Sequence, residues 1–193
     1  MRELHNLIRE HSATEREYKK YIDSLKNSVL TAFYTPTPIV EATAEALIRA
    51  DVIPTRVLDP SAGVGIFGQH FGLSIPGCEI VCYEKDLLTA KILNTIKNEW
   101  TVPTTVRAEG FQNIPEDRIG YFDIVASNIP FGDTKVYDRT FERGGDPVRK
   151  QAQKGVHNYF FLKGVDTLRE GGILAFITSQ GVLDSPRNEP IRA

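Results

Sequence analysis

Cysteine is scarce in this 193-residue sequence, which has two, Cys78 and Cys82, near or within one expected strand. The pair is too sparse for a disulfide framework or a zinc site, so we expect two small, buried hydrophobic side chains and no metal. Apolar runs are also short, and none approaches the roughly 18 residues of a membrane span. The charged start, Met1 to His5, is not the pattern of a secretory signal. We therefore expect a cytoplasmic protein without membrane association.

An excess of charge of one sign is lacking too. The sequence has 23 lysine and arginine residues against 25 aspartate and glutamate residues, and its formal net charge is −2. Domains that bind nucleic acid by themselves are usually basic, so tight binding of a duplex by these residues alone is not expected. The charge is still compatible with a catalytic module whose affinity for nucleic acid comes from another part of the protein. Because 41% of the residues are apolar, the chain can bury a core and is not globally disordered.

Short apolar segments alternate with amphipathic ones from residue 56 to residue 178. In chain order we expect a strand at 57–59, a helix at 66–71, a strand at 80–83, a helix at 86–98 capped by Asp86, strands at 104–108 and 122–126, a helix at 157–169 and a strand at 173–178. Before them, Pro38 opens a helix to about Ala50, with Thr37 as its cap. This alternation predicts a doubly wound α/β domain with a mostly parallel sheet.

The first 31 residues follow a different pattern. Aromatic and apolar side chains recur there at helical spacing, namely Tyr18, Tyr21, Ile22, Leu25 and Val29. The string from Ser12 to Glu15 fits a capping box. We expect residues 1–32 to form an N-terminal helical extension, which packs on the edge of a main domain at 33–193.

A glycine-rich turn follows the first expected strand. Asp59-Pro-Ser-Ala-Gly63-Val-Gly65 opens a helix, and its glycines allow a tight turn and close approach of a ligand. Glu84 closes the next strand, where an acid can accept the hydroxyl protons of a ribose. The string up to Gly68 also fits a dinucleotide fingerprint, but Asp59 would repel a pyrophosphate and attract an amino group. An adenosine with an amino-acid tail, S-adenosylmethionine, satisfies both demands.

Three motifs in chain order resemble those of the amino-group DNA methyltransferases: Tyr34–Pro36, the Asp59–Gly65 string and Asn128–Phe131. The chain looks most like N6-adenine enzymes whose DNA-recognition part comes last, such as Type I modification subunits and the large methylases of mobile elements. The resemblance covers roughly residues 30–185. It implies a sheet of the S-adenosylmethionine-dependent methyltransferase type, incomplete after the fifth strand, and a recognition domain that is absent.

The resemblance also assigns cofactor contacts. Tyr34, Thr35 and Pro36 would contact the methionine end of the cofactor. Glu109 would contact the adenine amine, and Phe111 would form an apolar wall against the ring. The expected cofactor-binding set is Tyr34, Thr35, Pro36, Asp59, Ser61, Ala62, Gly63, Gly65, Glu84, Glu109, Phe111 and Asn128.

The expected catalytic residues, Asn128, Ile129, Pro130 and Phe131, follow the fourth strand. An adenine amine is a poor nucleophile because its lone pair is delocalised into the ring. The side-chain carbonyl of Asn128 and the backbone carbonyl of Ile129 can accept its two N–H bonds and return the lone pair. Pro130 restrains the backbone, and Phe131 offers a stacking face for a flipped base. The family usually has proline in place of Ile129, so Ile129→Pro should keep activity equal or higher.

Three functions stay open at this stage. The first is adenine-N6 methylation of DNA, which Tyr34–Pro36 favours. The second is methylation of protein glutamine or of an RNA amine. The third is a catalytically degenerate module that holds cofactor or DNA within a larger mobile-element protein, which Ile129 and the missing second half favour. The segment 128–155, with six basic and four acidic residues, could close over DNA or be a disordered loop. DNA binding by this chain alone should be weak, so a recognition region or partner subunit is expected.

Overall fold

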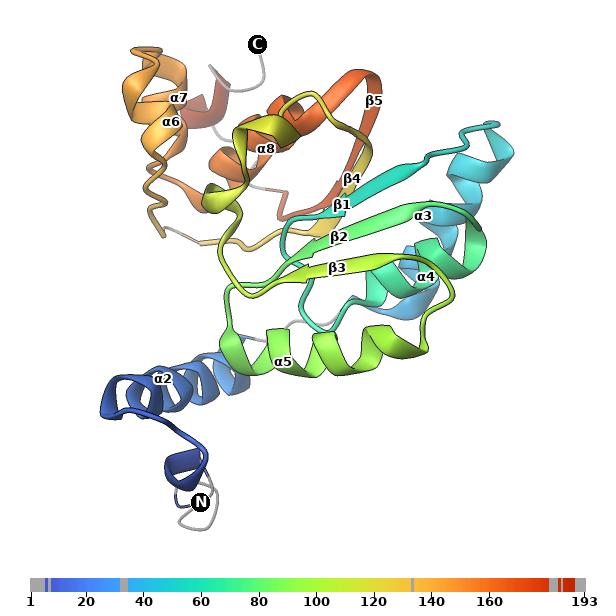
Figure 1. Cartoon of the computed structure of the whole chain (residues 1–193). Helices are drawn as coiled ribbons and strands as arrows, with labels where there is room; N and C mark the ends of the chain where they lie inside the picture. Colours follow the sequence, from blue (N-terminus) through green and yellow to red (C-terminus); the bar gives the residue numbers. More distant parts are fainter. Residues whose placement is uncertain are drawn as a thin grey trace.

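The computed structural model describes residues 6, 8–31, 35–132, 134–180, 184 and 186–189 (Figure 1). Its sheet has five strands, which are β1 (Arg56–Asp59), β2 (Glu79–Tyr83), β3 (Thr104–Arg107), β4 (Phe122–Asn128) and β5 (Leu168–Ile177). They pair in the order β3-β2-β1-β4-β5, and every pair is parallel. The order reverses between β1 and β4, so the predicted doubly wound parallel sheet is confirmed.

Helices cover both faces of the sheet. The helices in the described ranges include α2 (Glu15–Thr31), α3 (Thr37–Arg49), α4 (Ile66–Ser74), α5 (Leu87–Ile96), α6 (Arg139–Arg143), α7 (Pro147–Ala152) and α8 (Val156–Thr167), with short 3-10 turns η1 (Lys97–Glu99), η2 (Phe111–Asn113), η3 (Glu116–Arg118) and η4 (Pro186–Asn188). Figure 1 shows α4 and α5 on one side of the sheet and α8 with α6 and α7 on the other. None of the helices in the described ranges is long and apolar enough to cross a membrane.

The core is divided between the two faces, because successive strand residues point to opposite sides. In β1, Val57 packs into the cluster with α3 and α4, and the next residue, Leu58, packs into the cluster with α6 and α8. Cys78 and Cys82 are buried and free, as the sequence predicts. Such double burial explains why these strands are short, nearly continuous apolar runs.

Two helix caps show what short sequence patterns can and cannot predict about where a helix begins. Asp86 caps α5 as predicted, because its side chain accepts a hydrogen bond from Thr89 N at 2.9 Å. The capping box of α2 was expected at Ser12–Glu15 but lies two residues later. Thr14 Oγ1 accepts from Glu17 N at 3.1 Å, and the Glu17 carboxylate accepts from a backbone N–H in return. Both strings have an acid three residues after a hydroxyl, so spacing alone could not separate them.

Helix α2 packs on α5 at the edge of the sheet domain. Tyr21 is buried, and the Ser24 hydroxyl donates to the Asp86 carboxylate at the start of α5. The side chains of Leu25 and Val29, which the sequence also places on this apolar face, lie outside the described residues. The contact brings the N-terminal helix to the same side of the domain as the carboxyl ends of the strands (Figure 1).

Residues 134–155 form ordered structure, so the disordered loop offered as one alternative is wrong. The segment contains α6 and α7, and Asp138, Phe141 and Gln153 within it are buried. Phe141 joins the core cluster on the α8 side of the sheet. Phe141 is therefore a core residue within a polar stretch, which the composition of the segment did not indicate.

Candidate functional site

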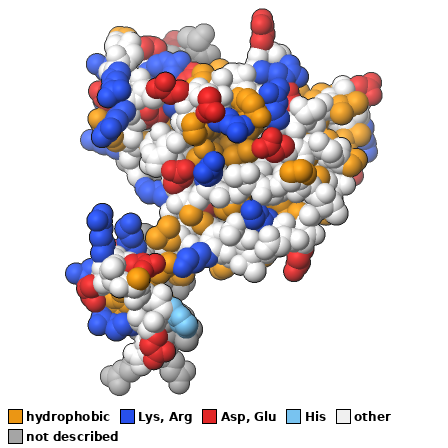
Figure 2. Space-filling model, in the orientation of Figure 1, with side chains coloured by type: hydrophobic (Ala, Val, Ile, Leu, Met, Phe, Trp, Pro, Cys, Tyr) orange, Lys and Arg blue, Asp and Glu red, His pale blue; other side chains and the backbone are white. Residues whose placement is uncertain are grey.

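A cavity of about 1200 Å³ opens at the carboxyl ends of the strands. Its lining combines the turns that follow β1, β2, β3 and β4 with side chains of α2 and α8. Figure 2 shows lysine and arginine side chains over α2, at the lower left, and over the α6–α7 region, at the upper left. Loops after neighbouring parallel strands meet at one edge, which is the ordinary place for a ligand in such a sheet.

Asp59 ends β1 directly beneath this lining. Its Oδ1 accepts hydrogen bonds from Ser127 Oγ at 2.7 Å and from Ser61 N at 3.2 Å. Its Oδ2 is buried and has no hydrogen-bond partner among the described residues. Burial raises the pKa of Asp59 to about 7, against an ordinary value of 3.8. An acceptor left open next to Ser61, which lines the cavity, is suited to a donor from a ligand.

The glycines of this string are required for two different physical reasons. Gly63 adopts φ 56° and its N–H donates to Glu84 Oε2 at 2.8 Å, so it shapes the turn. Gly65 adopts φ 85°, and a Cβ there would lie 2.7 Å from the ring of Trp100. A Cβ on Gly68 would lie 2.8 Å from the same ring. Gly65 and Gly68 therefore allow α4 to pack closely against Trp100.

Glu84 follows β2 and lines the cavity. Its Oε2 accepts from Gly63 N, and its Oε1 accepts from Asp86 N at 2.7 Å. Burial raises the pKa of Glu84, which the hydrogen bonds to its carboxylate partly offset. Each carboxylate oxygen can accept more than one hydrogen bond, so hydroxyl donors from a ligand can still be bound.

The turn after β3 supplies an aromatic wall. Phe111 is buried, lines the cavity and lies 5.4 Å, between ring centroids, from Phe160 of α8. Ala108 and Gly110 line the cavity as well, whereas Glu109 between them is half-buried and is not among its described lining residues. The adenine contact expected of Glu109 stays a prediction.

The tip of β4 alternates between core and cavity. Asn128 ends the strand beside Ile177 of β5. Ile129 is 1% exposed, packs in the α8-side core and donates its N–H to Ile177 O at 3.1 Å. Pro130 and Phe131 line the cavity, and Phe131 is 48% exposed. Ile129→Pro would remove this buried side chain and the donor of this hydrogen bond, while its expected effect on activity stays a prediction.

The structure brings only part of the expected set into the cavity lining. Ser61, Glu84, Phe111, Pro130 and Phe131 are there. Other expected residues are described but are not among the lining residues, namely Thr35, Pro36, Asp59, Ala62, Gly63, Gly65, Glu109, Asn128 and Ile129. Pro36 precedes α3 and Thr37 is its first residue, so Thr37 is not the cap of that helix. Tyr34 lies outside the described residues.

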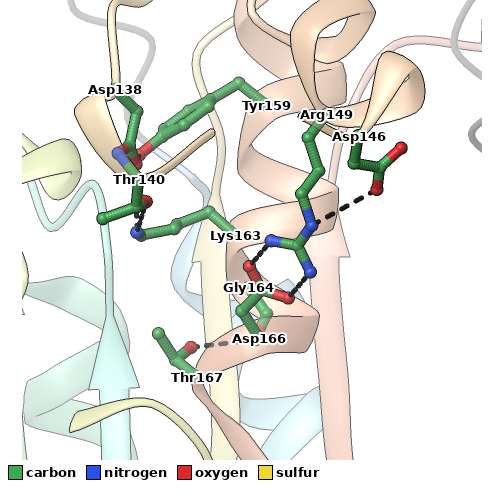
Figure 3. A network of polar contacts seen from close by, with 9 residues as sticks. All are labelled: Asp138, Thr140, Asp146, Arg149, Tyr159, Lys163, Gly164, Asp166 and Thr167. Atoms are coloured by element: carbon green, nitrogen blue, oxygen red, sulfur yellow. Dashed lines mark hydrogen bonds and ion pairs between the residues drawn. The ribbon is translucent and has the colours of Figure 1, made fainter. Parts of the chain in front are cut away.

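A buried polar network that sequence reasoning missed adjoins the cavity (Figure 3). Asp138 Oδ2 accepts from Tyr159 OH at 2.7 Å and lies 3.0 Å from Lys163 Nζ. Asp138 Oδ1 accepts from Thr140 N and Oγ1, at 2.7 and 2.6 Å. Burial would raise the pKa of Asp138, but these hydrogen bonds outweigh it and hold the pKa below its usual range. A lysine four residues after Tyr159 on an apolar helix face was the available signal.

Comparisons with known proteins agree with this geometry. Residues 19–192 match the family model described as N-6 DNA Methylase. Type II methyltransferase M.XamI of Xanthomonas campestris pv. amaranthicola is 31% identical over 163 residues, which are 79% of this chain and 30% of that protein. Defense against restriction protein B of Escherichia phage P1 is 27% identical over 168 residues, or 84% of this chain and 7% of that protein. The chain thus spans less than a third of either relative.

Solved structures share the fold. A modification subunit ascribed to a type I restriction enzyme of Vibrio vulnificus YJ016 matches with a TM-score of 0.67 at 18% identity, over 92% of this chain and 41% of that one. A protein from Listeria monocytogenes, described as a class I S-adenosylmethionine-dependent methyltransferase, matches with a TM-score of 0.68 at 15% identity, over 95% of this chain and 59% of that one. At these identities the similarity concerns the fold alone.

Proposed function

Since this chain belongs to the N-6 DNA methylase family, we propose that it transfers a methyl group from S-adenosylmethionine to N6 of an adenine in DNA. The observation that carries the proposal is the placement of Pro130 and Phe131 in the same cavity as Glu84. The last two residues of the motif that would activate an amine and the acid that would bind a ribose thus face one space, although Glu84 and Asn128 are 44 positions apart in the sequence.

The residues of the cavity fit this cofactor. S-adenosylmethionine supplies an electrophilic methyl group, and it carries a ribose, an ammonium group and no phosphate. Glu84 would accept the ribose hydroxyls, and the open Oδ2 of Asp59 would accept a donor near Ser61. Phe111 would lie against the adenine ring. A dinucleotide fits less well, because its pyrophosphate would lie against the carboxylates of Asp59 and Glu84.

The residues at the tip of β4 would then activate the adenine amine. Asn128 Oδ1 and the carbonyl of Ile129 would accept the two N–H bonds of the adenine amine, which concentrates its lone pair on nitrogen. Flipping a base out of the duplex costs a few kcal/mol. Stacking on an aromatic ring recovers about 1–3 kcal/mol, and the half-exposed ring of Phe131 is placed to provide it. The proton can leave after the methyl arrives, so no strong general base is needed.

Choice of DNA sequence belongs to parts that this chain does not include. Its curated relatives are several times longer, and its own net charge of −2 supports little phosphate neutralisation. We therefore propose that a recognition region or a partner subunit supplies most of the affinity for DNA, and that this chain alone binds duplex weakly.

The test is to identify the methylated product. The complete gene product is incubated with S-adenosylmethionine labelled in its methyl group and with plasmid DNA, total RNA and cell protein in parallel. We expect label in DNA, recovered as N6-methyladenine by mass spectrometry. Label confined to RNA or to protein glutamine would replace the substrate class. Cofactor binding without any methylated product would point to the degenerate module.

A further inference from the structure

Residues 134–138 lead into α6 without helix or strand structure and line the cavity, and the last of them, Asp138, has extended backbone with φ −125° and ψ 118°. Their burial alternates, as it does in extended backbone. Val136 and Asp138 face inward, and Asp138 is 2% exposed. Lys135, Tyr137 and Arg139 face outward, and Tyr137 is 68% exposed. We call these three outward side chains the rim strip. All three line the cavity that Phe131 also lines, as do Val136 and Asp138.

The rim strip stands on a rigid base. Val136 N donates to Gln153 O at 2.9 Å, and Asp138 N donates to Gln153 Oε1 at 2.7 Å. Between two of the exposed positions, the Asp138 side chain is held by Tyr159 and Lys163 of α8 (Figure 3). A buried ion pair seldom adds net stability over apolar residues of the same size. What this pair does is hold Asp138, and hence its two neighbours, in one place.

The exposed ring of Tyr137 has no packing reason. Aromatic side chains that contribute to a core are buried, as are Phe141 and Tyr159 close by. Tyr137 instead lies at the cavity rim with a cation two residues away on either side. Aromatic rings that stack on bases, combined with cations that follow the phosphates, are how proteins bind unpaired nucleic acid.

Charge around the opening favours an anion. Four basic side chains reach the lining, from α2 (Lys20), the β2 turn (Lys85) and the rim strip (Lys135 and Arg139), and all four are exposed. Among the acids of the lining, Glu84 and Asp86 hold backbone N–H groups, and Asp138 is paired with Lys163. Asp23 is the exposed acid of the described lining. The accessible charge at this opening is therefore mainly positive.

We propose that the rim strip binds the DNA strand beside the target adenine, with Tyr137 stacked on the base next to it and Lys135 and Arg139 on phosphates. The inference rests on the proposed function and adds a substrate-binding surface to it. In extended chain the four residue-to-residue steps from Lys135 to Arg139 cover on the order of 13 Å. That distance matches about four nucleotide steps of roughly 3.4 Å each along a strand.

The experiment measures binding of a labelled duplex with one unpaired adenine by fluorescence anisotropy, using the complete gene product. We expect Tyr137→Ala to weaken binding about tenfold, as loss of one stacked base does, and Tyr137→Phe to stay within about twofold. Lys135→Ala and Arg139→Ala should each weaken binding several-fold. Each should also lower the slope of log K against log salt by about 0.9, the value for one phosphate contact.

Matched controls come from the same segment. Arg143→Ala and Lys150→Ala remove exposed cations that do not belong to the described cavity lining. They should leave both affinity and salt slope as in the wild type. If they lower the slope as much as the rim variants do, the attraction is diffuse charge and the rim strip is not a site. Thermal unfolding and S-adenosylmethionine affinity by calorimetry should be unchanged in every variant.

Failure of this inference can be told from failure of the proposed function. Rim variants that bind the duplex as tightly as the wild type, while the wild type forms N6-methyladenine, would overturn the rim strip alone. A wild type that forms no N6-methyladenine but loses DNA binding on Tyr137→Ala would overturn the proposed reaction and support the strip. The same rim variants can be tested on an uncharged glutamine-containing peptide. If they lose as much affinity for that peptide as for DNA, the rim strip is not a nucleic-acid surface.

Discussion

Lys163 Nζ lies 3.0 Å from Asp138 Oδ2 in an ion pair that is almost wholly buried. The pair joins α8 to the segment that follows the Asn128–Phe131 tip, so one helix supports both the core and the rim of the cavity. Tyr159 completes the contact from the turn of α8 before Lys163. The wall of the site is thereby tied to the fold by charge as well as by apolar packing.

Removing one partner of this pair should be costly. Lys163→Met leaves the Asp138 carboxylate buried without its cation, and we expect the free energy of unfolding to fall by about 3–5 kcal/mol. Adding Asp138→Asn should recover a large part, because the amide oxygen can still accept from Thr140 N. Urea unfolding of the two variants checks this. A loss below about 1 kcal/mol in Lys163→Met would show that the ion pair is not effectively desolvated.

Asp59 should give stability a distinctive pH dependence. Burial raises its pKa from 3.8 to about 7, so between these values the folded state holds a proton that the unfolded state releases. The free energy of unfolding therefore falls as pH rises from about 4 to about 7 and levels off above. Asp59→Asn cannot titrate and should lack this component. Urea unfolding across the range compares the two, and parallel profiles would remove Asp59 as the cause.

Cofactor affinity should depend on Glu84. Glu84→Gln keeps one of the two acceptors for backbone N–H groups and loses the charge. We expect S-adenosylmethionine to bind about tenfold or more weakly, in line with loss of a charge-assisted hydrogen bond. Glu79→Gln, at the opposite end of β2, is the matched control and should bind normally. Calorimetry measures both. Equal affinity in Glu84→Gln and wild type would withdraw the ribose assignment.

Asn128 should act on the reaction more than on binding. Asn128→Ala removes one of the two acceptors for the adenine amine, an interaction made mainly in the transition state, so kcat should fall on the order of 100-fold. Phe131→Ala should chiefly raise KM for DNA by loss of stacking. Steady-state kinetics of the complete gene product separates the two effects. Wild-type levels of N6-methyladenine with Asn128→Ala would exclude the catalytic role.

Ile129 should be a structural position. Ile129→Pro deletes a buried side chain and the hydrogen bond from Ile129 N to Ile177 O. We expect the free energy of unfolding to fall by roughly 2–5 kcal/mol, the range for large-to-small core changes. Ile129→Val keeps the N–H and should cost only about 0.5–1.5 kcal/mol. Thermal and urea unfolding measure both, and an Ile129→Pro variant as stable as wild type would contradict a structural role for this position.

The sequence by itself determined that strands and helices alternate in a doubly wound parallel sheet, and at which edge of it a candidate site is expected. Apolar runs alternating with helices predict parallel strands, and the carboxyl ends of parallel strands share one edge. Glu84 and Asn128 each follow or end such a run, so their placement near one opening could be predicted without coordinates. The cap of α5 by Asp86 was equally local, since its partner is three residues away.

Only the tertiary structure decided which residues meet across the chain. Gly65 is required by Trp100, Ile129 by the core and Asp138 by Lys163, and each partner lies on another element. Hydrophobic periodicity indicates which face of a helix or strand is buried, but not which residues pack against that face. An aspartate in a polar stretch and a lysine in an amphipathic helix both look solvated in sequence. Packing of α6 against α8 excludes water from both, and that alone turns them into a pair that supports the site.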